Sequence, residues 1–241
     1  MAQRKIQFVN REIYHVVVRA VEGTELFKDN KDYLRIIHDL FEFNDANPAS
    51  SNFRTGLYRN KNNVTRSDIV TLTSEKRKKR KMLVEILAFC LMPNHVHLLI
   101  RQLKESGISK FMQKLGGYAT YYNKKYERKG HLFQGKFYEV HIQNNEQLKT
   151  AFVYIHTNPV AIIFPKWKEK GVKSAARAID YVEKYRWSSY PDYLGNKNFP
   201  SITNREFLLR VMGGVAGCRN FVNTWLKFKQ ELADFNYVAI E

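Results

Sequence analysis

The sequence predicts an α+β fold built on an antiparallel sheet. Residues 13 to 21 are rich in β-branched side chains and form the first expected strand. Two apolar runs, residues 83 to 91 and 95 to 101, flank the tight-turn pair Pro93 and Asn94 and are typical of a hairpin. Between and after the strands, apolar residues recur every three or four positions, as in amphipathic helices. A chain of 241 residues can hold one core with an appendage, or two small domains.

The other expected elements alternate along the chain. They are a helix over 31 to 43, a helix over 106 to 126, a strand over 131 to 142, a helix over 146 to 158, and two helices between 203 and 235. Asn144 can cap the helix over 146 to 158, and Pro159 closes it. The last two helices are expected to break at Gly213, Gly214 and Gly217.

An insertion separates the first helix from the hairpin. Residues 44 to 82 are rich in Asn, Ser, Thr and Gly, and they end in a basic run. The run consists of Lys76, Arg77, Lys78, Lys79, Arg80 and Lys81. Such a run is either a solvated surface or an arm that binds phosphates, and the charge of the whole chain favours the second interpretation.

The overall charge predicts a polyanionic partner. The chain has 40 Lys and Arg against 23 Asp and Glu, a formal net charge of +17. Nucleic acid is the first expectation and an anionic membrane the second, but no apolar stretch approaches the roughly 20 residues that span a bilayer, and the start of the chain has no signal-peptide core. The two cysteines, Cys90 and Cys218, stand in apolar surroundings and are expected to be core residues. The low cysteine content fits a reducing compartment, so we expect an intracellular protein that is cytoplasmic and nucleoid-associated.

Two histidines on one expected strand suggest a metal site. His95 and His97 are two residues apart, so they point to the same face, while Val96, Leu98 and Ile100 point to the core. Two neutral imidazoles can hold a divalent cation if a third ligand approaches from elsewhere. The alternative is a hydrogen-bonded structural pair.

The helix that closes at Pro159 carries a second group. Tyr154 and Asn158 are four residues apart and share a helix face. A nearby cation would favour the phenolate of Tyr154, and the amide oxygen of Asn158 could complete its coordination. The alternative is a packing tyrosine with a satisfied hydroxyl. His15, on the first strand, is interpreted as a core or edge histidine rather than a functional one.

Aromatic residues near the end of the chain allow two interpretations. Trp167, Trp187, Tyr190 and Tyr193 stand among polar residues, and further aromatics follow in the last helices. They could stack on nucleic-acid bases. Packing of the last helices onto the core is the simpler interpretation.

Four segments resemble a known family. They are M-P-N-H-V-H-L-L-I (92 to 100), K-G-H-L-F-Q-G-K-F-Y (129 to 138), Y-I-H-T-N-P-V (154 to 160) and R-W-S-S-Y-P-D-Y (186 to 193). In this order they resemble the single-tyrosine HUH transposases, and most closely the REP-associated tyrosine transposases. The resemblance extends from about Tyr14 to Gly195.

The resemblance implies both a fold and a chemistry. The fold is a ferredoxin-like central antiparallel sheet with helices on one face. A catalytic domain over residues 1 to 195, with its insertion at about 44 to 82, would precede a C-terminal helical extension over 196 to 241. His95, His97 and Asn158 would hold a divalent metal, Mg or Mn, and Tyr154 would be the nucleophile.

The expected activity is cleavage and transfer of single-stranded or hairpin DNA through a 5'-phosphotyrosine, by a monomer or homodimer. Besides the basic run, the expected DNA contacts are Lys124, Lys125, Arg128, Lys129, Gln134 and Lys136. One alternative is a catalytically silent nucleic-acid-binding protein on the same scaffold. Another is a metal-dependent phosphohydrolase, which is disfavoured because Leu99 stands where such enzymes carry a further histidine.

Overall fold

The computed structural model describes residues 7–47 and 80–238, and its centre is a four-stranded antiparallel sheet of order β2-β3-β1-β4. The strands are β1 (Ile13–Arg19), β2 (Val84–Met92), β3 (His95–Gln102) and β4 (Tyr138–Ile142). The helix α1 (Asn30–Glu42) lies between β1 and β2 in sequence, and α4 (Gly107–Leu115) and α5 (Tyr118–Lys125) lie between β3 and β4. This is the connectivity and strand order of a ferredoxin-like fold, so the predicted α+β class is confirmed.

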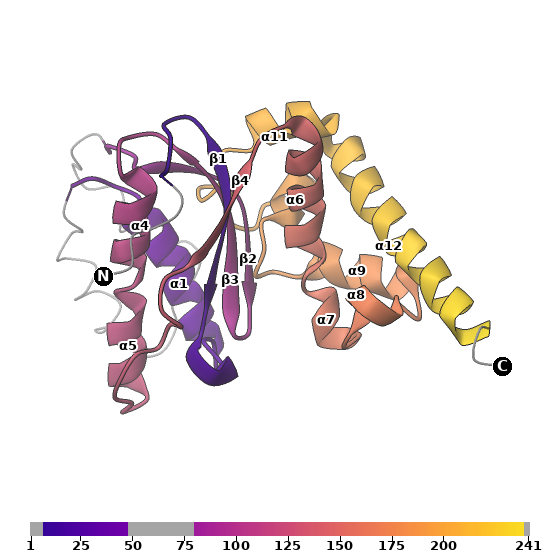
Figure 1. Cartoon of the computed structure of the whole chain (residues 1–241), viewed down its shortest axis with the longest axis horizontal. Helices are drawn as coiled ribbons and strands as arrows, with labels where there is room; N and C mark the ends of the chain where they lie inside the picture. The colour runs from indigo at the N-terminus through magenta and orange to yellow at the C-terminus, as the bar shows by residue number, and fades with distance from the viewer. Residues whose placement is uncertain (1–6, 48–79, 239–241) are drawn as a thin grey trace.

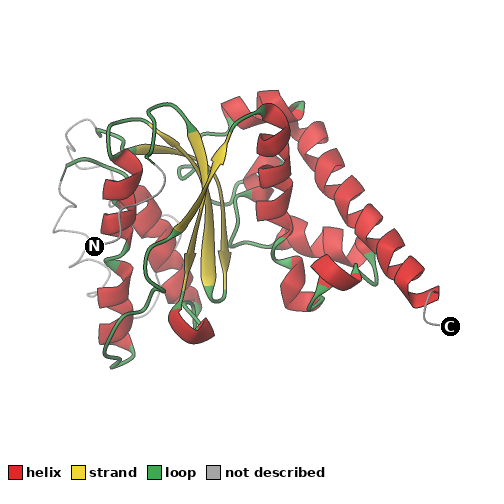
Figure 2. Ribbon diagram, viewed as in Figure 1, coloured by secondary structure: helices red, strands yellow, loops and turns green. Residues whose placement is uncertain are grey.

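Helices cover both faces of the sheet (Figures 1 and 2). On one face lie α1, α4 and α5, as the ferredoxin-like expectation requires. On the other face α6 (Asn145–Thr157) packs against the sheet, and the later helices lie on the same side of the sheet. These are α7 (Val160–Ile163), α8 (Trp167–Lys170), α9 (Ala175–Lys184), α10 (Tyr190–Tyr193), α11 (Glu206–Met212) and α12 (Gly214–Val238).

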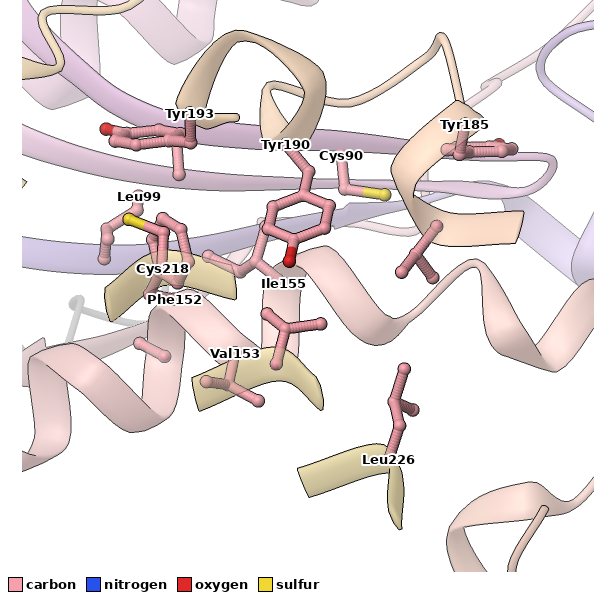
Figure 3. Close-up of a cluster of buried hydrophobic side chains, with 14 of the residues drawn as sticks. Cys90, Leu99, Phe152, Val153, Ile155, Tyr185, Tyr190, Tyr193, Cys218 and Leu226 are labelled. Atoms are coloured by element: carbon pink, nitrogen blue, oxygen red, sulfur yellow. The ribbon is translucent and has the colours of Figure 1, made fainter. Parts of the chain in front are cut away.

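Each face of the sheet has its own apolar core. Val96, Leu98 and Ile100 are buried on the α1 side, as predicted. The opposite face is buried as well, because Leu99 of β3 and Phe152 of α6 belong to a second cluster that continues to α12. Figure 3 shows this cluster, in which Phe152, Val153 and Ile155 of α6 gather with Cys90 and Leu99 of the sheet and with Cys218 and Leu226 of α12.

The core interpretation is confirmed for the cysteines and for most of the late aromatic residues, but Phe221, Trp225 and Phe228 of α12 are at least 38% exposed. Cys90 and Cys218 are both fully buried. The second core also buries Trp167, Tyr190 and Tyr193, while Trp187 stacks on Tyr33 with ring centroids 4.3 Å apart. In the described ranges, no helix is both long and apolar enough to cross a membrane.

Three predicted elements differ from those observed. The helix predicted over 106 to 126 is interrupted at Gly116 and Gly117, where the Gly117 amide bonds to the Lys114 carbonyl with the tighter i to i+3 spacing. The strand predicted from residue 131 begins only at Tyr138, because Gly135 turns the backbone with φ +57°. Gly217 does not break a helix. It lies within α12, where a Cβ would come within 1.8 Å of the Met212 carbonyl oxygen.

Candidate active site around His97 and Tyr154

Strand pairing gathers three histidines on the α6 face of the sheet. β1 pairs with β3 so that Arg19 lies opposite His95 and Val17 opposite His97. His15 therefore lies diagonally across from His97 on the same face. The Nε2 atom of His15 is 3.0 Å from Nδ1 of His97, and the two rings are stacked with centroids 5.2 Å apart.

The helix α6 brings Tyr154 to these histidines. Asn144 caps its first turn by accepting a hydrogen bond from the Gln147 amide, as predicted. Phe152 and Ile155 are buried against the sheet, and this fixes the helix rotation so that Tyr154 lies at the rim. The Tyr154 ring meets His97 edge-on at 5.6 Å and His15 at 5.8 Å between centroids. Tyr154 is 38% exposed, and its hydroxyl has no hydrogen-bond partner in the described part of the chain.

The site keeps its imidazoles neutral. Burial, with the charges of Arg19 and Lys168, lowers the pKa of His95 to about 4. Burial and Lys168 lower the pKa of His15 to about 4, and burial with the neighbouring imidazoles holds the pKa of His97 well below its usual value. At neutral pH each ring therefore has one unprotonated nitrogen with a lone pair, and one of these lone pairs accepts the hydrogen bond between His15 and His97.

Two of these lone pairs suit a cation. His95 Nδ1 lies 2.7 Å from the Asn94 side-chain oxygen, so Nδ1 donates and Nε2 keeps its lone pair. His97 Nε2 is buried and has no partner among the described residues, and it keeps its lone pair in the tautomer whose Nδ1 donates to His15 Nε2. No three His, Cys, Asp or Glu side chains in the described ranges converge as a metal site. A cation here would therefore rely on the two Nε2 atoms and on amide or water oxygens.

Asn158 lies in the same site but is engaged by a neighbour. Its Nδ2 donates to the Tyr154 carbonyl at 2.7 Å, and its Oδ1 accepts from Lys168 Nζ at 2.9 Å. The same Nζ lies 4.0 Å from the centroid of the Tyr154 ring. The structure thus brings together His95, His97, Tyr154 and Asn158, which the sequence analysis singled out.

Sequence analysis missed two members of this site. Lys168 stands on the four-residue helix α8, where no periodicity or motif marks it. His15 was interpreted as a core or edge histidine, although its partner is His97. The contact between His15 and His97 follows from the register in which the first strand pairs with the His-X-His strand, and the sequence does not give that register.

The predicted DNA contacts have mixed surroundings. Lys76, Arg77, Lys78 and Lys79 lie outside the described residues. Arg80 stacks on the Phe41 ring and donates to the carbonyls of Phe41 and Asn44, and Lys125 pairs with Asp29 and Asp32. The exposed members are Lys81, Lys124, Lys129, Gln134 and Lys136, and Arg128 is half-buried and bonds to Asn123.

The helix α5 lies across the sheet from α6, the helix that carries Tyr154 (Figure 1). It nevertheless reaches the same end of the sheet as His95. The Tyr122 hydroxyl of α5 donates to the Glu25 carbonyl, and the next residue, Leu26, donates its amide to the Pro93 carbonyl in the β2–β3 turn. A DNA strand that passes this end of the sheet could contact both the basic end of α5 and the site around His95.

The described part of the chain thus combines a His-X-His pair on a buried sheet with a tyrosine presented from a facing helix. Residues 57–158 match a family model described as "Transposase IS200 like". The resemblance predicted from the motifs is therefore confirmed over this part of the chain, which contains His95, His97, Tyr154 and Asn158. This match supports a role in DNA transposition.

Among solved structures, the chain is similar to one described as "Structure of the REP associates tyrosine transposase bound to a REP hairpin". The two share 14% identity over 86% of this chain and 93% of that chain, with a TM-score of 0.46. No curated protein matches this chain.

Proposed function

We propose that this protein cleaves single-stranded DNA and transfers the strand through a covalent 5'-phosphotyrosine on Tyr154. The observation that carries the proposal is the edge contact of the Tyr154 ring with His97, made between separate elements of the fold. An exposed phenol beside neutral imidazoles is accessible to a nucleotide, and it lies in the region that matches the transposase family.

The chemistry requires no further reactant. The Tyr154 oxygen forms a bond to phosphorus as the bond from phosphorus to the 3'-oxygen breaks. The phenol releases its proton, and the departing oxygen takes up one proton to become a 3'-hydroxyl. One phosphate diester replaces another, so the step is reversible. A 3'-hydroxyl from another strand can attack the phosphotyrosine and complete strand transfer.

We assign the metal-holding role to His95, His97 and Asn158. When bound, a divalent ion such as Mg or Mn would supply Lewis-acid polarisation of the phosphate. The free Nε2 atoms of the two histidines support this assignment. Asn158 can join the ligand set only when its Oδ1 exchanges Lys168 for the ion.

We expect a DNA partner with an unpaired segment beside a hairpin, as the motif resemblance implies. Lys124, Arg128 and Lys129 at the end of α5, together with the basic run before β2, would hold backbone phosphates without reading sequence. The division into a catalytic domain over 1–195 and an extension over 196–241, the cytoplasmic and nucleoid-associated location, and the monomeric or dimeric state stay predictions.

Trapping the covalent intermediate tests the proposal. The protein is incubated with Mg or Mn ions and a labelled pool of hairpin-flanked single strands with random linkers, and denaturing gels are then used to detect protein-linked DNA. Mass spectrometry should place the nucleotide on Tyr154. Binding without cleavage would favour the catalytically silent alternative, and cleavage without any adduct would favour hydrolysis by water.

A further inference from the structure

Lys168 stands at the centre of the proposed site. Its ammonium contacts two of the four assigned residues, since it lies over the Tyr154 ring and donates to Asn158 Oδ1. Its positive charge also helps to lower the pKa of His15, His95 and His97, so the same cation acts on all three imidazoles. The ammonium therefore touches both the proposed nucleophile and an assigned metal ligand.

The fold fixes the backbone of Lys168 from both sides. The preceding residue, Trp167, is 2% exposed and anchors α8 in the second core. The Lys168 carbonyl accepts a hydrogen bond of 2.9 Å from Lys229 Nζ of α12, and the Lys229 carbonyl accepts one from the Val172 amide. The C-terminal helix therefore holds the segment that carries the ammonium.

No internal anion balances this charge. Among the residues that the structure describes, no carboxylate forms an ion pair with Lys168 or with Arg19, which lies opposite His95 in the β1–β3 pairing. Two exposed cations beside neutral imidazoles give this site an excess of positive charge. An anion from outside the chain is the partner that such a site attracts.

We propose that Lys168 binds a non-bridging oxygen of the phosphate that Tyr154 attacks, and is thus a further catalytic residue. This proposal rests on the function proposed above. A fixed ammonium at this position offsets the charge that develops on the phosphate during attack. When the Lys168 ammonium moves from Asn158 to the phosphate, it also frees the Asn158 amide oxygen, which the metal assignment requires.

The test compares Lys168→Ala with Lys170→Ala, a matched control on the same short helix. Covalent adduct formation is followed under single-turnover conditions with Mn ions and the hairpin pool. We expect Lys168→Ala to slow adduct formation about 100- to 1,000-fold. Lys168→Arg should recover part of the rate and Lys170→Ala nearly all of it. Thermal unfolding of the variants reports whether the fold is intact.

A second measurement separates this proposal from the function on which it rests. Affinity for a hairpin-flanked strand is measured in EDTA at several salt concentrations. Loss of one phosphate contact in Lys168→Ala should lower the slope of log affinity against log salt by roughly 0.7, with little change in Lys170→Ala. If the unaltered protein forms no adduct but the slope still falls, the phosphate contact stands and the proposed reaction is wrong.

Two results would overturn the role of Lys168. One is an adduct rate and a salt slope in Lys168→Ala equal to those of Lys170→Ala. The other is a faster rate together with tighter Mn binding in Lys168→Ala, which would show that the ammonium merely competes with the metal for Asn158.

Discussion

The tyrosines on the two faces of the sheet differ in what their hydroxyls contact. On the α5 face, Tyr118 donates to the Leu26 carbonyl at 2.6 Å and Tyr122 to the Glu25 carbonyl at 2.8 Å. Tyr126 donates to Asp32, and burial together with this carboxylate raises the pKa of Tyr126 to about 12. On the α6 face, the Tyr154 hydroxyl has no such partner in the described part of the chain, and the ring lies against histidines.

This difference distinguishes the tyrosines whose hydroxyls stabilise the fold from the exposed tyrosine that we propose as the nucleophile. A hydroxyl that donates to a buried carbonyl stabilises the fold, and withdrawing it would leave an unsatisfied acceptor. An exposed hydroxyl on a well-packed helix is free to meet a substrate. We therefore do not expect Tyr122 to act as the nucleophile. The alternative to Tyr154 is Tyr138 of β4, which is 59% exposed and lies in one row with Val17 and His97 on the α6 face.

The largest expected effect comes from Tyr154→Phe. The change removes the attacking oxygen, so we expect no covalent adduct, while DNA binding and thermal stability remain close to those of the unaltered protein. Tyr122→Phe should do the opposite, keeping the adduct and losing about 1 kcal/mol of unfolding free energy. Denaturing gels and thermal unfolding measure the two effects. If Tyr154→Phe still formed an adduct and the adduct mapped to Tyr138, the nucleophile would be Tyr138 of β4 and not Tyr154.

Replacing both His95 and His97 by Ala should abolish cleavage while retaining most of the DNA affinity, because phosphate contacts are spread over many cations. Cleavage gels and DNA titration in EDTA measure the two properties separately. His131→Ala, a change at an exposed histidine outside the site, provides the control. Full cleavage by the double variant would rule out the metal assignment.

A smaller effect is expected from His15→Ala. His15 holds the His97 ring through the 3.0 Å contact, and losing such a support weakens metal binding about 10- to 100-fold. Calorimetric titration with Mn ions in the absence of DNA measures this directly. His15→Gln, which can still accept a hydrogen bond, should bind more tightly than His15→Ala. Unchanged affinity in both variants would make His15 a packing residue.

The smallest effect concerns the basic run before β2. Arg80 is held by Phe41 and Asn44, so the test of the expected phosphate arm leaves Arg80 unchanged. Neutralising Lys76, Arg77, Lys78, Lys79 and Lys81 while retaining Arg80 should reduce the slope of log affinity against log salt by roughly 0.7 per lost contact. An unchanged slope would show that the run is only solvated surface.

Local patterns were sufficient for much of this fold. The alternation of polar and apolar residues in β3 correctly predicted that His95 and His97 share a face, and helical spacing together with Asn144 correctly predicted α6. These features depend on neighbours within a few residues, which the sequence displays directly. Boundaries were less predictable where glycines act through the backbone, as at Gly116 and within α12 at Gly217.

The sequence by itself determined the strands and helices of the sheet unit, the His-X-His pair, and the shared helix face of Tyr154 and Asn158. Only the tertiary structure decided which residues from distant segments meet at that pair. His15 joins through strand register, and Lys168 joins because Trp167 and Lys229 fix a short helix without any periodic pattern. Register and helix docking are set by packing over the whole core, so no local pattern of residues encodes them.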